Sequence, residues 1–195
     1  MTFHIRMGEQ KDAPGIAATL AEAFFDHFNS LCDDPKQIAD ALTPAIHTDS
    51  FVIAEDESTG EIVETIGIAD ADDYPVAVQP KQLRKAFGLL RGTIAGRVMR
   101  SEFYQPKTFR KGQAQISFVA VRKKARGHHL ATVMLEKLLR LCNYALYTLD
   151  VVEGNEKVLP IYESVGFIRT GKEKEKGASM KGFSFRYLME YRPEA

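Results

Sequence analysis

The order of strand-like and helix-like segments predicts an α/β protein with a mixed central sheet of about six to seven strands flanked by helices. Segments of alternating or continuous apolar residues are interleaved with segments whose apolar residues recur every three or four positions. Hairpin signals stand near both ends of the chain, so part of the sheet must be antiparallel. The 195 residues contain no internal repeat and no linker-like composition, which indicates one domain over 1–195.

The first half of the chain begins with a strand at 3–7, followed by a helix whose start is marked by Asp12 and Pro14. A second, shorter helix is expected at 34–45. Two strands at 51–55 and 62–68 then flank a turn at 58–60, which predicts a hairpin.

A helical insertion is expected at about 79–101, because apolar residues keep a helical period from Pro80 to Arg100. Glycine recurs there at every fourth position, at Gly88, Gly92 and Gly96. Since each glycine costs a helix about 1 kcal/mol relative to alanine, these positions need a reason. Close packing against another backbone is one reason, and the floor of a substrate groove is the other.

The second half begins with the strongest strand signal, at 115–121, followed by a helix at 130–141 and a strand at 146–152. A short helix is expected at 155–165, bent by Pro160, which cannot donate a backbone hydrogen bond. Strands at 167–172 and 183–191 then form a closing pair, with a solvated charged loop at 173–177 between them.

Composition excludes several classes of function. Basic and acidic residues number 26 each, so a nucleic-acid partner is not expected. Cys32 and Cys142 are the two cysteines, too few for a disulfide framework or a cysteine-based zinc site. The chain has neither a signal peptide nor an apolar run of membrane-spanning length, which predicts a cytoplasmic protein without a membrane partner.

A basic turn between the strand at 115–121 and the helix at 130–141 predicts an anion site. The first backbone N–H groups of a helix have no intrahelical partner and carry partial positive charge, which suits a phosphate group. Gly127 would let a ligand approach the backbone closely. Four basic side chains add charge beside it: Arg122, Lys123, Lys124 and Arg126.

Two motifs together resemble the GCN5-related N-acetyltransferase (GNAT) superfamily. The first is Arg126-Gly-His-His-Leu-Ala131, which opens a helix after a hydrophobic strand. The second is Asn155 at the start of a short helix that ends in Tyr162-Glu-Ser-Val-Gly-Phe167. The resemblance covers about 115–171, and it implies a sheet whose two central strands splay apart at the cofactor site.

The resemblance implies roles for individual residues. Main-chain groups of Val119, Ala120 and Val121 would bind the pantetheine arm of acetyl-CoA. Arg126 and the backbone of the following turn would hold the pyrophosphate, the turn comprising Gly127, His128, His129, Leu130, Ala131 and Thr132. Asn155 would contact the cofactor arm, cap its helix, or do both. Tyr162 would be the general acid that protonates the departing sulfur, or else a tyrosine that packs inside the core.

The sequence departs from the family pattern in two ways. His129 stands where the motif has a glycine, so its side chain must point away from the phosphates. His128 and His129 are neighbours that point about 100° apart on a helix, so they predict no metal site. The strand at 113–121 carries no acid to serve as general base. Candidates by position alone are Glu64, Asp70, Asp72, Asp73 and His27, and none is assigned.

The resulting hypothesis is an N-acetyltransferase that moves an acetyl group from acetyl-CoA to a primary amine of a small molecule or peptide. The alternative is a non-catalytic acyl-CoA-binding sensor. His129, Pro160 and the missing acid on the strand at 113–121 favour it, and intact Asn155 and Tyr162 oppose it. An acidic cluster at Asp70, Asp72 and Asp73 is one candidate for attracting the amine. Aromatic residues form another candidate acceptor pocket or simply pack the core: Phe24, Phe25, Phe28, Tyr74 and Phe103. The acceptor and the oligomeric state, a homodimer included, stay open.

Overall fold

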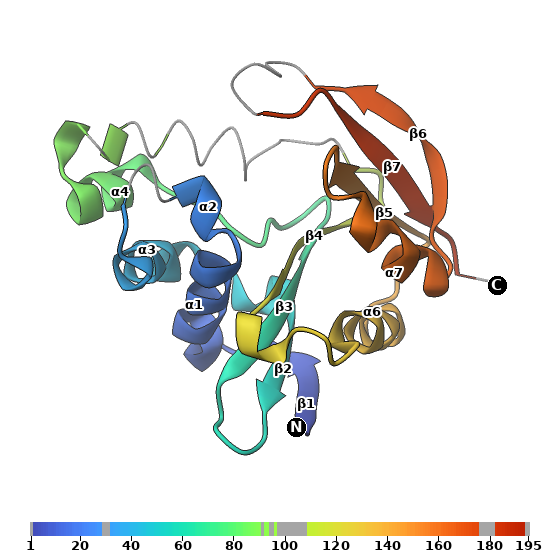
Figure 1. Cartoon of the computed structure of the whole chain (residues 1–195), viewed down its shortest axis with the longest axis horizontal. Coiled ribbons are helices and arrows are strands. Elements are labelled where there is room, and N and C mark those ends of the chain that lie inside the picture. Colours follow the sequence, from blue (N-terminus) through green and yellow to red (C-terminus); the bar gives the residue numbers. More distant parts are fainter. Residues whose placement is uncertain are drawn as a thin grey trace.

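The computed structural model describes residues 2–28, 32–90, 92–93, 96, 109–175 and 182–193, with the side chains of residues 27 and 28 left out. Within them the chain forms one seven-stranded sheet of order β1-β2-β3-β4-β5-β7-β6 (Figure 1). Only β4 and β5 pair in parallel, so the predicted mixed sheet is confirmed. The strands are β1 (Phe3–Met7), β2 (Phe51–Asp56), β3 (Ile62–Ala69), β4 (Gln113–Val121), β5 (Leu146–Val152), β6 (Ile168–Lys174) and β7 (Phe185–Tyr191).

Helices cover both faces of the sheet and enclose two separate apolar cores (Figure 1). A first core lies under α1 (Ala13–Ala23), α3 (Pro35–Leu42) and α4 (Pro80–Phe87). A second core lies on the other face, under α6 (Leu130–Leu141) and α7 (Leu159–Ser164). Side chains of β2 alternate between the two cores, with Phe51 and Ile53 in the first and Val52 and Ala54 in the second, because successive residues of a strand point to opposite faces.

The helix expected at 34–45 is α3, followed by the 3-10 turn η2 (Thr43–Ala45). The side chain of Asp34 accepts a hydrogen bond of 2.9 Å from the backbone N–H of Lys36, and Pro35 opens α3. The hairpin of β2 and β3 turns at Gly60, whose φ of 71° suits glycine. The first predicted helix divides into α1 and the short α2 (Phe25–Phe28). Phe24 and Phe25 pack against the first core, as the core interpretation of these aromatics predicts.

The insertion is helical at its described residues on both sides of Gly88, but the helix is interrupted there. The helix α4 ends at Phe87, and Gly88 adopts a φ of 77°, outside the helical region. Gly92 supports the packing explanation for the repeated glycines, because a Cβ at this position would collide with the backbone of Leu83 and Arg84. Phe103 and most of the insertion after Leu90 lie outside the described residues.

Two predictions in the second half also need correction. Pro160 lies in the first turn of α7, after a 3-10 turn η5 (Glu156–Val158), where no backbone N–H is required, so it starts the helix instead of bending it. The segment 173–177 is not simply a solvated loop. Its residues 173 and 174 belong to β6, and Glu175 is buried against Arg186. Residues 176 and 177 lie outside the described part of the chain.

Candidate functional site

The parallel strands β4 and β5 are joined over only part of their length. They pair from Gln113 with Leu146 to Gln115 with Thr148. Beyond this point β4 continues beside β3 as far as Val121, and β5 continues beside β7 as far as Val152. Within the described residues, the edge of β4 that faces β5 therefore has no strand partner from Ile116 onward. Main-chain donors and acceptors of Val119, Ala120 and Val121 belong to this segment.

A bulge in β4 marks the place where the strands part. Ser117 pairs with Gly67 and Ala120 with Thr65, so two residues of β4 stand opposite one residue of β3. One of these two, Phe118, has a left-handed φ of 51°, and its ring packs 6.4 Å from the ring of Phe51. Gly67 leaves room for this ring, since a Cβ there would lie 3.1 Å from it. The bulge lies in the part of β4 that no longer pairs with β5.

The turn after β4 combines two residues of left-handed φ, Gly127 and His129, with the start of α6. Gly127 has a φ of 82°, and a Cβ at this position would meet no atom within 4 Å. His129 is the N-cap of α6 and has a φ of 55°, the left-handed conformation that glycine adopts without strain. His129 thus takes up the backbone conformation of the glycine it replaces, and its side chain is exposed. Leu130, Ala131 and Thr132 form the first helical turn, whose N–H groups have no intrahelical acceptor.

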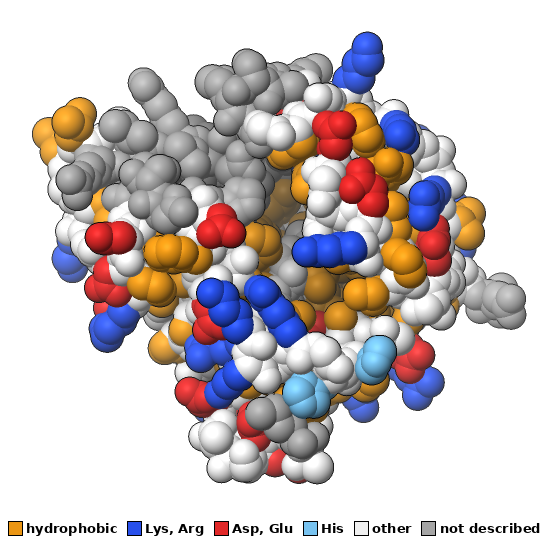
Figure 2. All heavy atoms as spheres, viewed as in Figure 1, with side chains coloured by type: hydrophobic (Ala, Val, Ile, Leu, Met, Phe, Trp, Pro, Cys, Tyr) orange, Lys and Arg blue, Asp and Glu red, His pale blue; other side chains and the backbone are white. Residues whose placement is uncertain are grey.

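The side chains around this turn are mostly tied to the protein. Arg122 donates a hydrogen bond of 3.2 Å to Thr19 of α1, and Lys124 pairs with Glu61. Arg126 bonds the carbonyl of Val121 at 3.4 Å, which keeps its guanidinium at the end of β4. His128 lies edge-on to Phe3, with ring centroids 6.3 Å apart. Figure 2 shows the hollow near the centre of this face, with Lys and Arg side chains along its lower side.

Tyr162 of α7 lies in the second core and is 9% exposed. Burial raises the pKa of its phenol, and the negative charges of Glu64 and Asp150 raise that pKa further. Asp150 points away from the second core, because its neighbours Leu149 and Val151 point into it. Glu64 lies on the side of that core. Carboxylates on both faces of the sheet thus disfavour ionisation of the phenol.

Asn155 precedes the 3-10 turn η5, and its side chain makes no capping hydrogen bond. The predicted N-cap role is therefore not realised by the side chain. Its backbone carbonyl instead accepts a hydrogen bond of 3.2 Å from Val158. Contact with the cofactor arm stays a prediction for this side chain.

Sequence reasoning missed a polar chain on the face opposite α7, where β4 and β5 begin to part. The Gln115 amide donates to Asp150 at 2.8 Å, and Arg186 of β7 donates to the same carboxylate at 2.6 Å. Arg186 also donates to Glu175 at 2.5 Å. All four side chains are largely buried. These side chains meet because of the register between β5 and β7, and no pattern within either strand predicts that register.

Of the acids considered as general base, Glu64 alone lies beside Tyr162. Its side chain is fully buried, and burial raises its pKa to about 8. Asp70 holds a turn, since its carboxylate accepts hydrogen bonds of 2.9 Å from the N–H groups of Asp72 and Asp73. The side chain of His27 lies outside the described residues.

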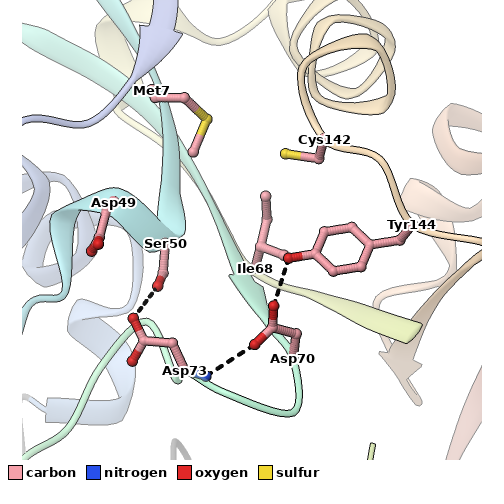
Figure 3. Close-up of a pocket in the computed structure, with 8 residues that line it drawn as sticks. All are labelled: Met7, Asp49, Ser50, Ile68, Asp70, Asp73, Cys142 and Tyr144. Atoms are coloured by element: carbon pink, nitrogen blue, oxygen red, sulfur yellow. Dashed lines mark hydrogen bonds between the residues drawn. The ribbon is translucent and has the colours of Figure 1, made fainter. Parts of the chain in front are cut away.

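Asp70 and Asp73 of the acidic cluster border a separate pocket of about 200 Å³ (Figure 3). Tyr144 donates to Asp70 at 2.6 Å, and Ser50 donates to Asp73 at 2.7 Å across this pocket. The pocket lies by the paired ends of β4 and β5, because Ala69, just before Asp70, pairs with Gln115. The strands part in the opposite direction, so these carboxylates do not face the gap.

No group of three or more metal-ligating side chains occurs among the residues that the structure describes. In that same part of the chain, no helix is long and apolar enough to cross a membrane.

Known proteins share both the sequence pattern and the fold. A family model for the acetyltransferase (GNAT) family matches residues 15–167, more than half of the chain. An N-acetyltransferase from Staphylococcus aureus superposes with a TM-score of 0.62 at 17% identity, covering 96% of this chain and all of the other. A ribosomal-protein-alanine N-acetyltransferase from Brucella melitensis gives a TM-score of 0.60 at 17% identity, with 97% and 99% covered.

The ribosomal-protein-S18-alanine N-acetyltransferase of Escherichia coli gives a TM-score of 0.59 at 14% identity, with 100% of this chain and 96% of the other covered. No curated protein matches the sequence significantly. At these identities the solved structures establish the fold, and the family model establishes membership: the chain belongs to the acetyltransferase (GNAT) family.

Proposed function

We propose that this protein transfers the acetyl group of acetyl-CoA to a primary amine of a small molecule or peptide. The observation that carries the proposal is the separation of β4 from β5, with an anion cradle after β4 and Tyr162 beside the gap. Each feature suits a different part of acetyl-CoA.

The cradle suits the pyrophosphate group. Gly127 presents open backbone, and the N–H groups of Leu130, Ala131 and Thr132 begin a helix of 12 residues. Such a helix start stabilises an anion through its free N–H groups and its dipole. Arg126, held at the end of β4, adds a positive charge.

The open edge of β4 suits the pantetheine arm. The arm carries amide groups, and the main chain of Val119, Ala120 and Val121 offers donors and acceptors that β5 does not use. Asn155 is proposed to contact the same arm from the opposite side of the gap. An arm laid along this edge brings the thioester toward Tyr162.

Tyr162 is proposed to act as general acid. The acceptor nitrogen attacks the thioester carbonyl carbon, and the bond from that carbon to sulfur breaks. The electron pair leaves on sulfur, to which the phenol of Tyr162 gives its proton. The attacking nitrogen, positively charged after the attack, gives one proton to water, and the Tyr162 phenolate takes a proton back from water, so the products are the amide and the free thiol of CoA. A phenol is protonated at neutral pH, so Tyr162 has a proton to give when the bond to sulfur breaks.

Thiol release from acetyl-CoA tests the proposal, measured against a panel of amino acids, polyamines and peptides with free amino termini. We expect amine-dependent release, with kcat lowered roughly 100-fold or more in Tyr162→Phe. The Kd of acetyl-CoA should stay unchanged, because phenylalanine retains the contact with Phe167. Tyr144→Phe, which removes a tyrosine hydroxyl from the separate pocket, is the matched control and should keep wild-type activity.

Full activity in Tyr162→Phe would contradict the assigned role. Binding of acetyl-CoA without turnover on any amine would favour the acyl-CoA-binding sensor instead.

A further inference from the structure

Glu64 is an exception to the rule that buried polar atoms have hydrogen-bond partners. Among the described residues, three buried side-chain atoms lack one: both carboxyl oxygens of Glu64 and the hydroxyl of Thr65. The side chain of Glu64 is completely buried. A buried carboxyl group without partners is costly, so its presence in the middle of a sheet calls for a functional explanation.

The position of Glu64 connects it with Tyr162. Glu64 pairs with Ala54 on β2 and with Val121 on β4. Residues opposite each other on paired strands point to the same face, and here both partners lie in or against the second core. Tyr162 enters the same core from α7.

The second core, which Glu64 faces, is formed by apolar and aromatic side chains. The buried residues that α6 contributes to it are Leu130, Met134, Leu135 and Leu138. Within the described part of the chain, Glu64 forms no ion pair, and burial is the cause that governs its ionisation. Asp150 acts on Tyr162 from the opposite face and is held by Gln115 and Arg186.

We propose that Glu64 is a positioning residue that sets how readily Tyr162 gives up its proton. As a neutral acid, Glu64 leaves the phenol able to protonate the departing sulfur. As a carboxylate, it holds the proton on the phenol. The inference rests on the proposed role of Tyr162 in acyl transfer, and Glu64 itself neither touches the substrate nor exchanges its proton during turnover.

The physical basis is charge repulsion in a medium of low dielectric. A carboxylate near a phenol disfavours the phenolate, and the interaction is stronger inside a protein than in water. Burial raises the pKa of Glu64 to about 8, so the group is neutral at pH 7 and ionised at pH 9. Tyr162 therefore becomes a weaker acid as the pH rises through about 8.

The test is a pH titration of the free protein, with the Cζ carbons of its seven tyrosines labelled with carbon-13 and followed by NMR. Tyr162→Phe identifies the Tyr162 signal. We expect this signal to shift in a step near pH 8 while the phenol keeps its proton. Glu64→Gln, a neutral side chain of the same size, should abolish the step, and Glu64→Asp should move it to another pH. Glu136→Gln changes an exposed glutamate on α6 and should leave it unchanged.

The same variants give a second readout in thiol release. Wild-type kcat should fall several-fold between pH 7.5 and 9.5, whereas kcat of Glu64→Gln should not show this decline. A step that persists in Glu64→Gln, or its absence from the wild type, would overturn the inference. The NMR titration needs no turnover. If no amine supports thiol release, the proposed function is overturned, but the effect of Glu64 ionisation on Tyr162 can still be measured.

Discussion

Two buried acids, Asp12 before α1 and Glu64 on β3, have opposite environments. Asp12 accepts hydrogen bonds from Arg6 at 2.6 and 3.1 Å and from the backbone N–H of Glu9 at 2.8 Å. Glu64 accepts none within the described structure and has no cation beside it. Asp12 ties β1 to the start of α1, which is a structural role. Glu64 lies next to Tyr162 and has no comparable structural task.

The two environments move the two pKa values in opposite directions. For Asp12, burial opposes ionisation, but Arg6 and the Glu9 N–H outweigh it and hold the pKa below its usual range. For Glu64, burial acts without opposition and raises the pKa to about 8. The difference shows that burial alone does not decide the charge of an acid in this protein; the partner supplied by the fold does.

The largest effect on the pH dependence of stability is expected for Glu64→Gln. Between the unfolded pKa of 4.5 and the folded pKa of about 8, only the unfolded chain ionises at this position, so the free energy of unfolding falls as pH rises. The fall is about 1.4 kcal/mol per pH unit, or about 5 kcal/mol over the window. Urea unfolding of wild type and variant at pH 5 and pH 7.5 measures it, and glutamine should remove this slope. Equal slopes in the two proteins would contradict a neutral buried Glu64.

A smaller effect of opposite sign is expected for Asp12→Asn. The lowered pKa of Asp12 contributes stability above its unfolded value, and this stability is lost as pH falls through the folded pKa. Removing the charge leaves Arg6 partly unpaired and should cost about 3 kcal/mol at pH 7. Urea unfolding measures the loss, and acetyl-CoA binding by the folded variant should be unchanged.

The control for Asp12→Asn is Asp40→Asn, which removes the pair of Asp40 with Lys36, 2.7 Å apart on the surface of α3. That exposed pair should contribute little to stability, far less than the buried pair of Asp12 with Arg6, because solvent screens it. If both variants lost the same stability, the contrast between buried and exposed pairs would be wrong.

Features carried by local sequence could be predicted. The strand, basic turn and helix from 115 to 141 are examples. Their apolar periods and Gly127 lie within the segment, so its structure can be predicted without knowing the rest of the fold. The same holds for Asn155, Tyr162 and Gly166 in the second motif. The separation of β4 and β5 followed from the family resemblance, because nothing in either strand alone indicates where pairing stops.

Features that depend on strand register could not be predicted. The burial of Glu64 arises because β3 lies between β2 and β4, and the chain of Gln115, Asp150 and Arg186 arises because β5 lies between β4 and β7. Two wrong predictions, the uninterrupted helix in the insertion and the bend at Pro160, could have been avoided from local sequence. Gly88 is a glycine at the end of an apolar helical face, and Pro160 stands where a helix can begin.

Calorimetric titration with acetyl-CoA, comparing wild type with Gly127→Asp, tests most directly whether the turn after β4 is the cofactor cradle. Aspartate at this position puts negative charge beside the helix start and strains a φ of 82°. Gly88→Asp is the control, because Gly88 has a φ of 77°, equally open surroundings and a place beside α4. We predict that Gly127→Asp weakens binding at least about 30-fold, roughly 2 kcal/mol, while Gly88→Asp binds like the wild type. Equal affinity in all three proteins would contradict the cradle and the acyl-transfer site built on it.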